Sequence, residues 1–180
     1  MNDPVIIQGG MGANISNWLL AKTVAKAGHM GVVSGTALDQ VLARRLQSGD
    51  PGGHLQRALS HFPAKDVAER ILERFYIPGG KKTDETFKPL PMFTATPKEA
   101  LIELTVAGNF VDVFLAKEGH DGLVGINYLE KIQLPNPASI YGAMLAGVDY
   151  VLVGAGIPRE VPGMIDSFID HKEVSIALDV

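Results

Sequence analysis

The sequence contains no cysteine among its 180 residues. Disulfides, thiolate metal sites and a cysteine nucleophile are therefore excluded, which fits a reducing compartment. The five histidines are scattered and form no pair at the spacing that places two metal ligands on one helical face, so we expect no metal site. A Gly-x-Ser-x-Gly motif is also missing, which leaves a serine hydrolase without support.

Basic runs and long apolar runs are missing as well. The 16 basic residues are dispersed among 20 acidic ones, and the net charge of -4 argues against binding to nucleic acid. No uncharged apolar run reaches the roughly 18 residues of a membrane span, and no signal peptide is recognisable. With 46% hydrophobic residues, the sequence predicts a globular cytoplasmic protein that handles a small molecule.

The first fifty residues read as two strand-helix units. Residues 4–8 form an apolar run closed by glycines, which is typical of a buried parallel strand. Ser16 can cap the following helix, which Gly28 ends. Residues 30–35 and 38–46 then repeat the strand and the helix.

The stretch from 48 to 88 interrupts this rhythm as an inserted segment, helical over about 55–75 and polar over 79–88. Beyond it we expect a short edge-like segment at 89–93, a helix capped by Thr96, and a short strand near 112–116. The alternation of strands and helices then resumes. We predict strands at 123–127, 150–153 and 174–178 and helices at 137–147 and 158–171.

Alternating strands and helices predict an α/β fold with a parallel sheet, either doubly wound or closed into a barrel. A complete (β/α)8 barrel takes about 250 residues, so we expect residues 1–180 to form one partial domain, about the first half of a TIM barrel. A smaller open sheet is the alternative. Because Val180 would end a strand with no helix after it, a fragment or truncated product is part of this expectation.

Ligands of parallel α/β folds bind at the carboxyl ends of the strands, so the residues after each predicted strand are the candidates for a site. Glycines allow a backbone to approach a flat ring closely, but they also make tight turns. Neither a dinucleotide fingerprint nor a P-loop is present. Four such places occur: Gln8-Gly9-Gly10-Met11-Gly12, Ser34-Gly35-Thr36, Gly125-Ile126-Asn127 and Gly154-Ala155-Gly156.

Each place has a simpler reading. The hydroxyls of Ser34 and Thr36 are more readily explained as caps of the next helix. The Asn127 amide can donate to and accept from a pyrimidine-like ring edge, or it can form a turn. Gly154 precedes a helix opened by Pro158, whose free amides could hold an anion or ring edge, although a plain turn explains the glycines nearly as well.

Two other places carry ionisable groups. The loop at 117–122 combines Glu118, His120 and Asp121, so general base chemistry is conceivable there, but a solvated surface loop is the better explanation. Asp179 could contact a polar substrate or belong to a following loop.

Three sequence features together resemble the nitronate monooxygenase, or 2-nitropropane dioxygenase-like, family. They are the opening Pro4-Val5-Ile6-Ile7-Gln8-Gly9-Gly10-Met11, the helix exit Ala27-Gly28-His29-Met30-Gly31-Val32-Val33-Ser34, and the strand ending Gly125-Ile126-Asn127. The likeness spans the whole chain in element order, and its specific motifs occupy about two dozen positions.

The resemblance implies an FMN-dependent TIM-barrel oxidoreductase that oxidises alkyl nitronates with dioxygen. It implies a flavin cradle in which Gln8, Gly9, Gly10 and Met11 lie against the ring, Asn127 binds its polar edge, and Gly154 lines the same mouth. The family's catalytic histidine and FMN phosphate site lie in a second half that these residues do not include. No catalytic role is therefore carried over to any residue, His120 included.

Two alternatives remain open. The 55–75 segment and the Tyr128-Leu129-Glu130-Lys131 continuation look closer to the related enoyl reductases of polyunsaturated fatty acid and polyketide synthases, which would use NADPH and FMN. The chain could also be a catalytically silent half-barrel that needs a missing C-terminal half, or that forms a homo-oligomer to cover its sheet edge.

Overall fold

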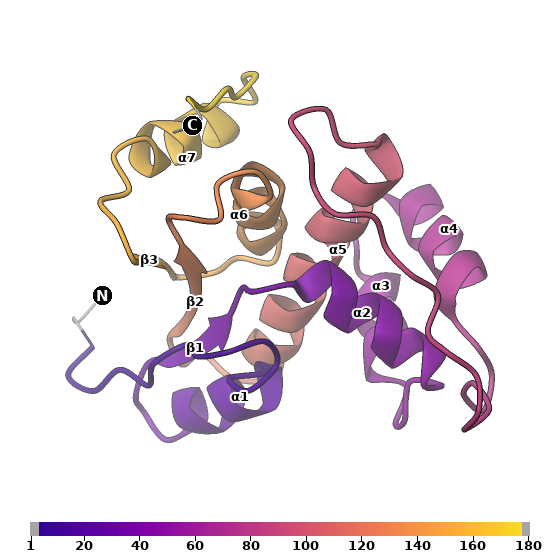
Figure 1. The fold of residues 1–180 in the computed structure, drawn as a ribbon. Coiled ribbons are helices and arrows are strands. Elements are labelled where there is room, and N and C mark those ends of the chain that lie inside the picture. The colour runs from indigo at the N-terminus through magenta and orange to yellow at the C-terminus, as the bar shows by residue number, and fades with distance from the viewer. Residues whose placement is uncertain (1–3, 178–180) are drawn as a thin grey trace.

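The computed structural model describes residues 4–177, and it shows a mixed α/β fold in which seven helices accompany a three-stranded parallel sheet (Figure 1). The strands lie in the order β1-β2-β3. They are β1 (Gly31–Ser34), β2 (Val124–Leu129) and β3 (Tyr150–Gly154). The helices are α1 (Trp18–Lys26), α2 (Leu38–Gln47), α3 (His54–Ser60), α4 (Lys65–Phe75), α5 (Glu99–Lys117), α6 (Asn136–Leu145) and α7 (Val161–Ile169).

The predicted first strand is shorter than its sequence pattern indicates. Only Ile7 forms a bridge, parallel to Met30, while Val5 and Ile6 lie in a bend, so this segment adds a single parallel pair beside β1. The Gln8 amide donates to the Met30 carbonyl at 3.0 Å, and the Met30 amide donates to the Ile6 carbonyl at 3.0 Å. Val5 is 96% exposed, so one side of this segment has nothing in the described structure to pack against.

One face of the sheet is covered by helices. Val33, Val124 and Ile126 point into the core on this face. A Cβ on Gly31 would strike the backbone of Ala21 in α1, and the Tyr128 hydroxyl donates to α5 and α6. The close approach of α1 explains why glycine stands at the start of β1.

The opposite face carries the side chains that alternate with the core residues along each strand. The register pairs Val32 with Gly125 and Ser34 with Asn127, so these positions share this face. The structure places the backbone of Gly10 directly over Val32 and Asn127.

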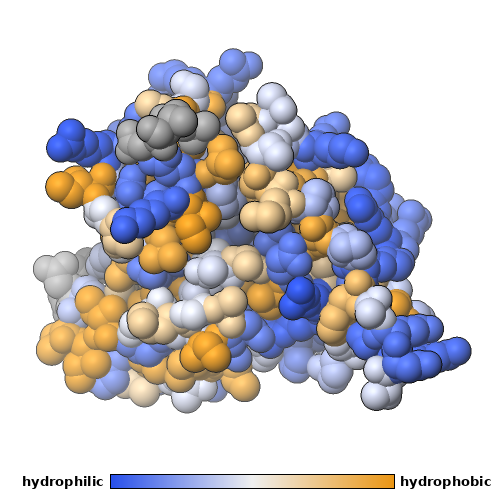
Figure 2. Space-filling view, viewed as in Figure 1, coloured by the Kyte–Doolittle hydropathy of each residue, from blue (hydrophilic) through white to orange (hydrophobic). Residues whose placement is uncertain are grey.

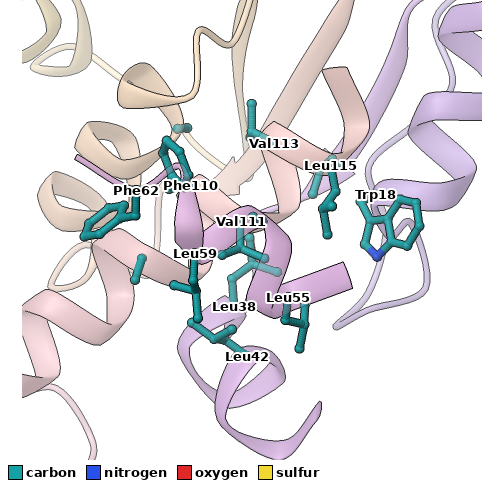
Figure 3. Packing of buried hydrophobic residues seen from close by; sticks show 14 of the residues in the cluster. Trp18, Leu38, Leu42, Leu55, Leu59, Phe62, Phe110, Val111, Val113 and Leu115 are labelled. Carbon is teal, nitrogen blue, oxygen red and sulfur yellow. The ribbon is translucent and has the colours of Figure 1, made fainter. Parts of the chain in front are cut away.

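The predicted strand near 112–116 is wrong, because these residues belong to α5, the longest helix of the described chain. This helix is buried on most sides, so apolar residues surround it rather than forming one stripe, and its helical period is weak in the sequence. Gly108 allows α2 to approach closely, since a Cβ there would meet the Leu38 carbonyl. Figure 3 shows Phe110, Val111, Val113 and Leu115 of α5 among side chains from α1, α2 and α3.

The inserted segment forms two helices, α3 and α4, followed by a long loop up to α5. The buried Asp50 carboxylate begins α3 by accepting from the amides of Leu55 at 3.0 Å and Gln56 at 2.9 Å. The predicted edge-like segment at 89–93 is an extended loop that pairs with no described strand.

The last predicted strand also differs. Residues 174–177 have no regular structure, and Leu178 and Asp179 lie outside the described residues. The final helix is shorter than predicted, because α7 begins at Val161 rather than at Pro158. Val174 and Ile176 pack partly against the core without joining the sheet.

Two predicted helix caps are replaced by neighbouring residues. Asn17, not Ser16, caps α1 by accepting from the amides of Leu19 and Leu20, both at 3.1 Å. Lys98 rather than Thr96 occupies the N-cap of α5, without a side-chain hydrogen bond. Within residues 4–177, every helix is too short or too polar to traverse a lipid bilayer.

Candidate functional site

Ser16 organises the loop that follows the first extended segment. Its hydroxyl donates to the Gly9 carbonyl and accepts from the Met11 amide, both at 3.0 Å. The Gln8 side chain donates to the same hydroxyl at 3.1 Å and accepts from the Val32 amide at 3.0 Å. The loop from Gln8 to Met11 is therefore held in one conformation against β1, and the serine that looked like a helix cap supports this loop instead.

Asn127 connects this loop to β2. Its side-chain amide donates to the Gly10 carbonyl at 3.1 Å. A Cβ on Gly10 would lie 2.7 Å from the Asn127 Cβ and 2.9 Å from a Val32 methyl group, so only glycine fits without displacement. The structure thus brings together five of the six site residues that the sequence indicated, namely Gln8, Gly9, Gly10, Met11 and Asn127.

The outward side of this loop is open. Gly9 is exposed, and a Cβ on it would meet only the Met11 side chain, at 3.8 Å. Met11 is 67% exposed. The Asn127 amide keeps one further N–H and both oxygen lone pairs beyond its bond to Gly10. An open glycine backbone and an exposed thioether can contact the face of a flat heteroaromatic ring, and an amide can bind its polar edge.

Gly154 lies on the same face of the sheet but further along. It pairs with Leu129, two residues beyond the pair of Asn127 and Leu152. Its carbonyl accepts from the Glu130 amide at 2.8 Å. Within residues 4–177, Gly154 makes no hydrogen bond to Asn127 or to Gly10. Gly154 therefore borders the same sheet edge without being part of the loop network.

A pocket of about 430 Å³ opens beyond the end of β3, within the usual size range for small-molecule sites. The sequence does not indicate this pocket, because its lining combines residues that are as many as 47 positions apart in the chain, from Glu130 to Ala177. Glu130 follows β2, Arg159 and Glu160 precede α7, and Ile176 lies in the final described segment. The Glu160 carboxylate accepts from the Ala177 amide at 3.1 Å, which fixes one wall.

The remaining predicted place, Ser34-Gly35-Thr36, has a structural role. Ser34 is buried, and its amide donates to the Ser16 carbonyl at 2.8 Å. The expectation that Ser34 or Thr36 caps α2 is wrong, because Ala37 occupies that cap in a left-handed conformation with no side-chain hydrogen bond. The Ser34 position instead ties β1 to the loop that Ser16 organises.

The loop at 117–122 lies at the opposite end of the sheet, since it leads into the amino end of β2. Glu118 accepts from Arg57 at 2.8 Å and from Lys22 at 3.3 Å, and these partners lower the pKa of its carboxyl to about 2. The His120 ring accepts from the Gly122 amide at 3.1 Å. These contacts indicate a structural role for the loop, which is more firmly bonded to its surroundings than the solvated surface loop that the sequence favoured.

One carboxyl with a strongly raised pKa is a residue that the sequence did not indicate. Asp112 is 1% exposed within α5 and accepts from the Trp18 amide at 3.3 Å. Burial raises the pKa of this carboxyl to about 6, and the positive charge of Arg45 opposes the rise. Asp112 belongs to α5, and its carboxylate binds the first amide of α1. This contact between two helices indicates a structural role.

Comparison of the chain with protein-family models, with curated proteins and with solved structures gives no match.

Proposed function

We propose that this chain forms one wall of an FMN site in an oxidoreductase of the nitronate monooxygenase type. The observation that carries the proposal is the Gln8–Met11 loop, which Ser16 and Asn127 hold against β1 and β2 with Gly10 buried and Gly9 exposed. Carboxyl ends of parallel strands are where α/β folds bind cofactors. The sequence resemblance to that flavin-dependent family concerns the same residues.

The strand order supports the idea that the fold is part of a barrel. Residues 4–8 and the three strands are parallel and are neighbours in chain order, which is the order of a (β/α)8 barrel. The described helix contacts lie on one face, and the face with Gly10 and Asn127 corresponds to a barrel interior. We propose that the fold is about half of such a barrel.

Each residue of the loop has a distinct task in the proposed site. The backbone of Gly9 and the side chain of Met11 would lie against the ring, and Asn127 would bind the polar edge with its remaining amide groups. Gln8 and Gly10 would hold the loop, and Gly154 would border the mouth. FMN, when bound, supplies the electron-transfer chemistry, and the protein supplies orientation and hydrogen bonds.

The test is titration of the purified chain with FMN, followed by flavin absorbance and fluorescence. We expect saturable binding, and we expect Gly9→Val to weaken it at least about tenfold, because a branched side chain would fill the open surface that the ring needs. Gly163→Val in α7 is the matched control, since a Cβ there also meets open space. No saturable binding, or equal binding by both variants, would refute the site.

Activity assays then separate the two enzyme candidates. Oxygen uptake on addition of an alkyl nitronate to the flavin-loaded chain supports the nitronate monooxygenase candidate. Bleaching of the flavin by NADPH without nitronate turnover supports the enoyl reductase alternative. A chain that binds FMN but gives neither signal is the silent half-barrel.

A further inference from the structure

A large apolar surface lies on the N-terminal segment and α1. We call it the N-terminal apolar patch, and it consists of Val5, Ile6, Ile7, Met11, Ile15, Leu19 and Leu20, each between 41% and 96% exposed. Exposed large apolar side chains gathered on one segment and the helix that follows it are typical of a surface that another protein covers. Figure 2 shows apolar surface at the lower left, where this segment and α1 lie in Figure 1.

The patch is also an open sheet edge. The Ile6 carbonyl and the Gln8 amide bond to Met30, so the amide and carbonyl of Ile7 point to the other side. An exposed β-branched edge of this kind is a template for pairing with another strand.

A second open edge lies at the other end of the sheet. In the described part of the chain, β3 pairs with β2 alone. Residues 174–177 run nearby, but the Ala177 amide bonds to Glu160 rather than to β3. Two apolar residues that follow β3 in the chain are also exposed. Ile157, in the loop before α7, is 73% exposed, and Ile169, at the end of α7, is 64% exposed.

We infer that two copies of this chain associate about a two-fold axis, so that β3 of each copy pairs in parallel with residues 4–8 of the other. Each copy supplies four parallel segments, namely the segment that Ile7 bridges to Met30 and the strands β1 to β3. Two copies supply eight, the number that closes a barrel whose side chains fill its interior. This arrangement covers both open edges and encloses the face that carries Gly10 and Asn127. An antiparallel pairing of two N-terminal segments would leave both β3 edges open.

Light scattering of the flavin-free chain during size-exclusion chromatography tests the association directly. We expect twice the chain mass of 19.2 kDa at micromolar concentration. Val5→Asp should raise the dimer dissociation constant about 100-fold or more, because it buries an unpaired charge in the interface. Met92→Asp is the matched control, since Met92 is 87% exposed in the loop before α5 and lies outside the patch.

Circular dichroism should show both aspartate variants folded, since neither side chain is buried in one copy. A monomeric wild-type chain at tens of micromolar, or equal weakening by Val5→Asp and Met92→Asp, would overturn the inference. The inference rests on the barrel-like strand order and not on flavin, so a monomer that binds FMN would refute the dimer and leave the cofactor site standing.

Cross-linking tests the pairing itself, because the chain has no cysteine of its own. A mixture of the Val5→Cys chain and the Leu152→Cys chain, treated with a short bismaleimide, should form a covalent dimer containing one chain of each kind. The Val5→Cys chain alone should not cross-link to itself. Efficient self-linking of that variant would show the antiparallel arrangement and overturn the closed one.

Discussion

Replacing Asp112 by asparagine is expected to stabilise the protein at neutral pH. The carboxyl is 1% exposed and has a single described hydrogen bond, to the Trp18 amide. Burial raises its pKa from 3.8 to about 6. Asparagine has nearly the same shape, keeps an oxygen that can accept from Trp18, and carries no charge to desolvate.

The sign and size follow from proton linkage. With a raised pKa, the native state binds more protons than the unfolded state between pH 3.8 and about 6, so the free energy of unfolding falls as the pH rises through this window. The rise of the Asp112 pKa from 3.8 to about 6 corresponds to a loss of about 3 kcal/mol in the free energy of unfolding at neutral pH. We therefore expect Asp112→Asn to be about 2–3 kcal/mol more stable than wild type at pH 7, with the difference vanishing below pH 4.

Urea unfolding at pH 4, 5, 6 and 7 measures this difference. Trp18, the single tryptophan, is 9% exposed and reports on unfolding by fluorescence, and circular dichroism provides an independent signal. Asp84→Asn, at an exposed loop position, is the control and should leave the pH dependence unchanged. A less stable Asp112→Asn protein at pH 7, or a difference that stays constant from pH 4 to 7, would refute the reasoning.

Four further substitutions test the packing of the candidate site, the hydrogen bonds behind the sheet and the ion pairs of the loop at 117–122. Gly10→Ala should cost about 1–3 kcal/mol, because its Cβ would lie 2.7 Å from the Asn127 Cβ, whereas Gly9→Ala should be nearly neutral in the same urea assay. Tyr128→Phe should cost about 1–3 kcal/mol in thermal unfolding, since it leaves two buried acceptors in α5 and α6 without their donor. Glu118→Gln should cost about 1 kcal/mol at pH 7. Because the folded pKa of Glu118 is lowered from 4.5 to about 2, this difference should fade as the pH drops through that window, and a constant penalty at acidic pH would contradict it.

Local sequence signals predicted most of the elements near the sheet. Strand runs closed by glycine or asparagine located β1, β2 and β3 within a few residues, because a parallel strand covered by helices must be apolar and must end where the chain turns. The same signals indicated Gln8–Met11 and Asn127, since polar and glycine residues at strand ends converge on one edge of a parallel sheet.

Elements whose form depends on distant neighbours were not predicted. Residues 112–116 are apolar enough for a strand, but they continue α5 because that helix is surrounded by others. Residues 4–8 and 174–177 have strand-like sequences, yet only Ile7 forms a bridge, because a strand needs a partner on at least one side as well as the right residues.

The sequence by itself determined the alternation of strands and helices and the residues that stand at the strand ends, because both depend on local periodicity and turn chemistry. Only the tertiary structure decided that Ser16 supports the loop instead of capping α1, that Asn127 bonds to the Gly10 carbonyl, and that Asp112 is buried beside Trp18. These contacts join residues as far as 117 positions apart in the chain, and no local pattern records which distant groups will meet.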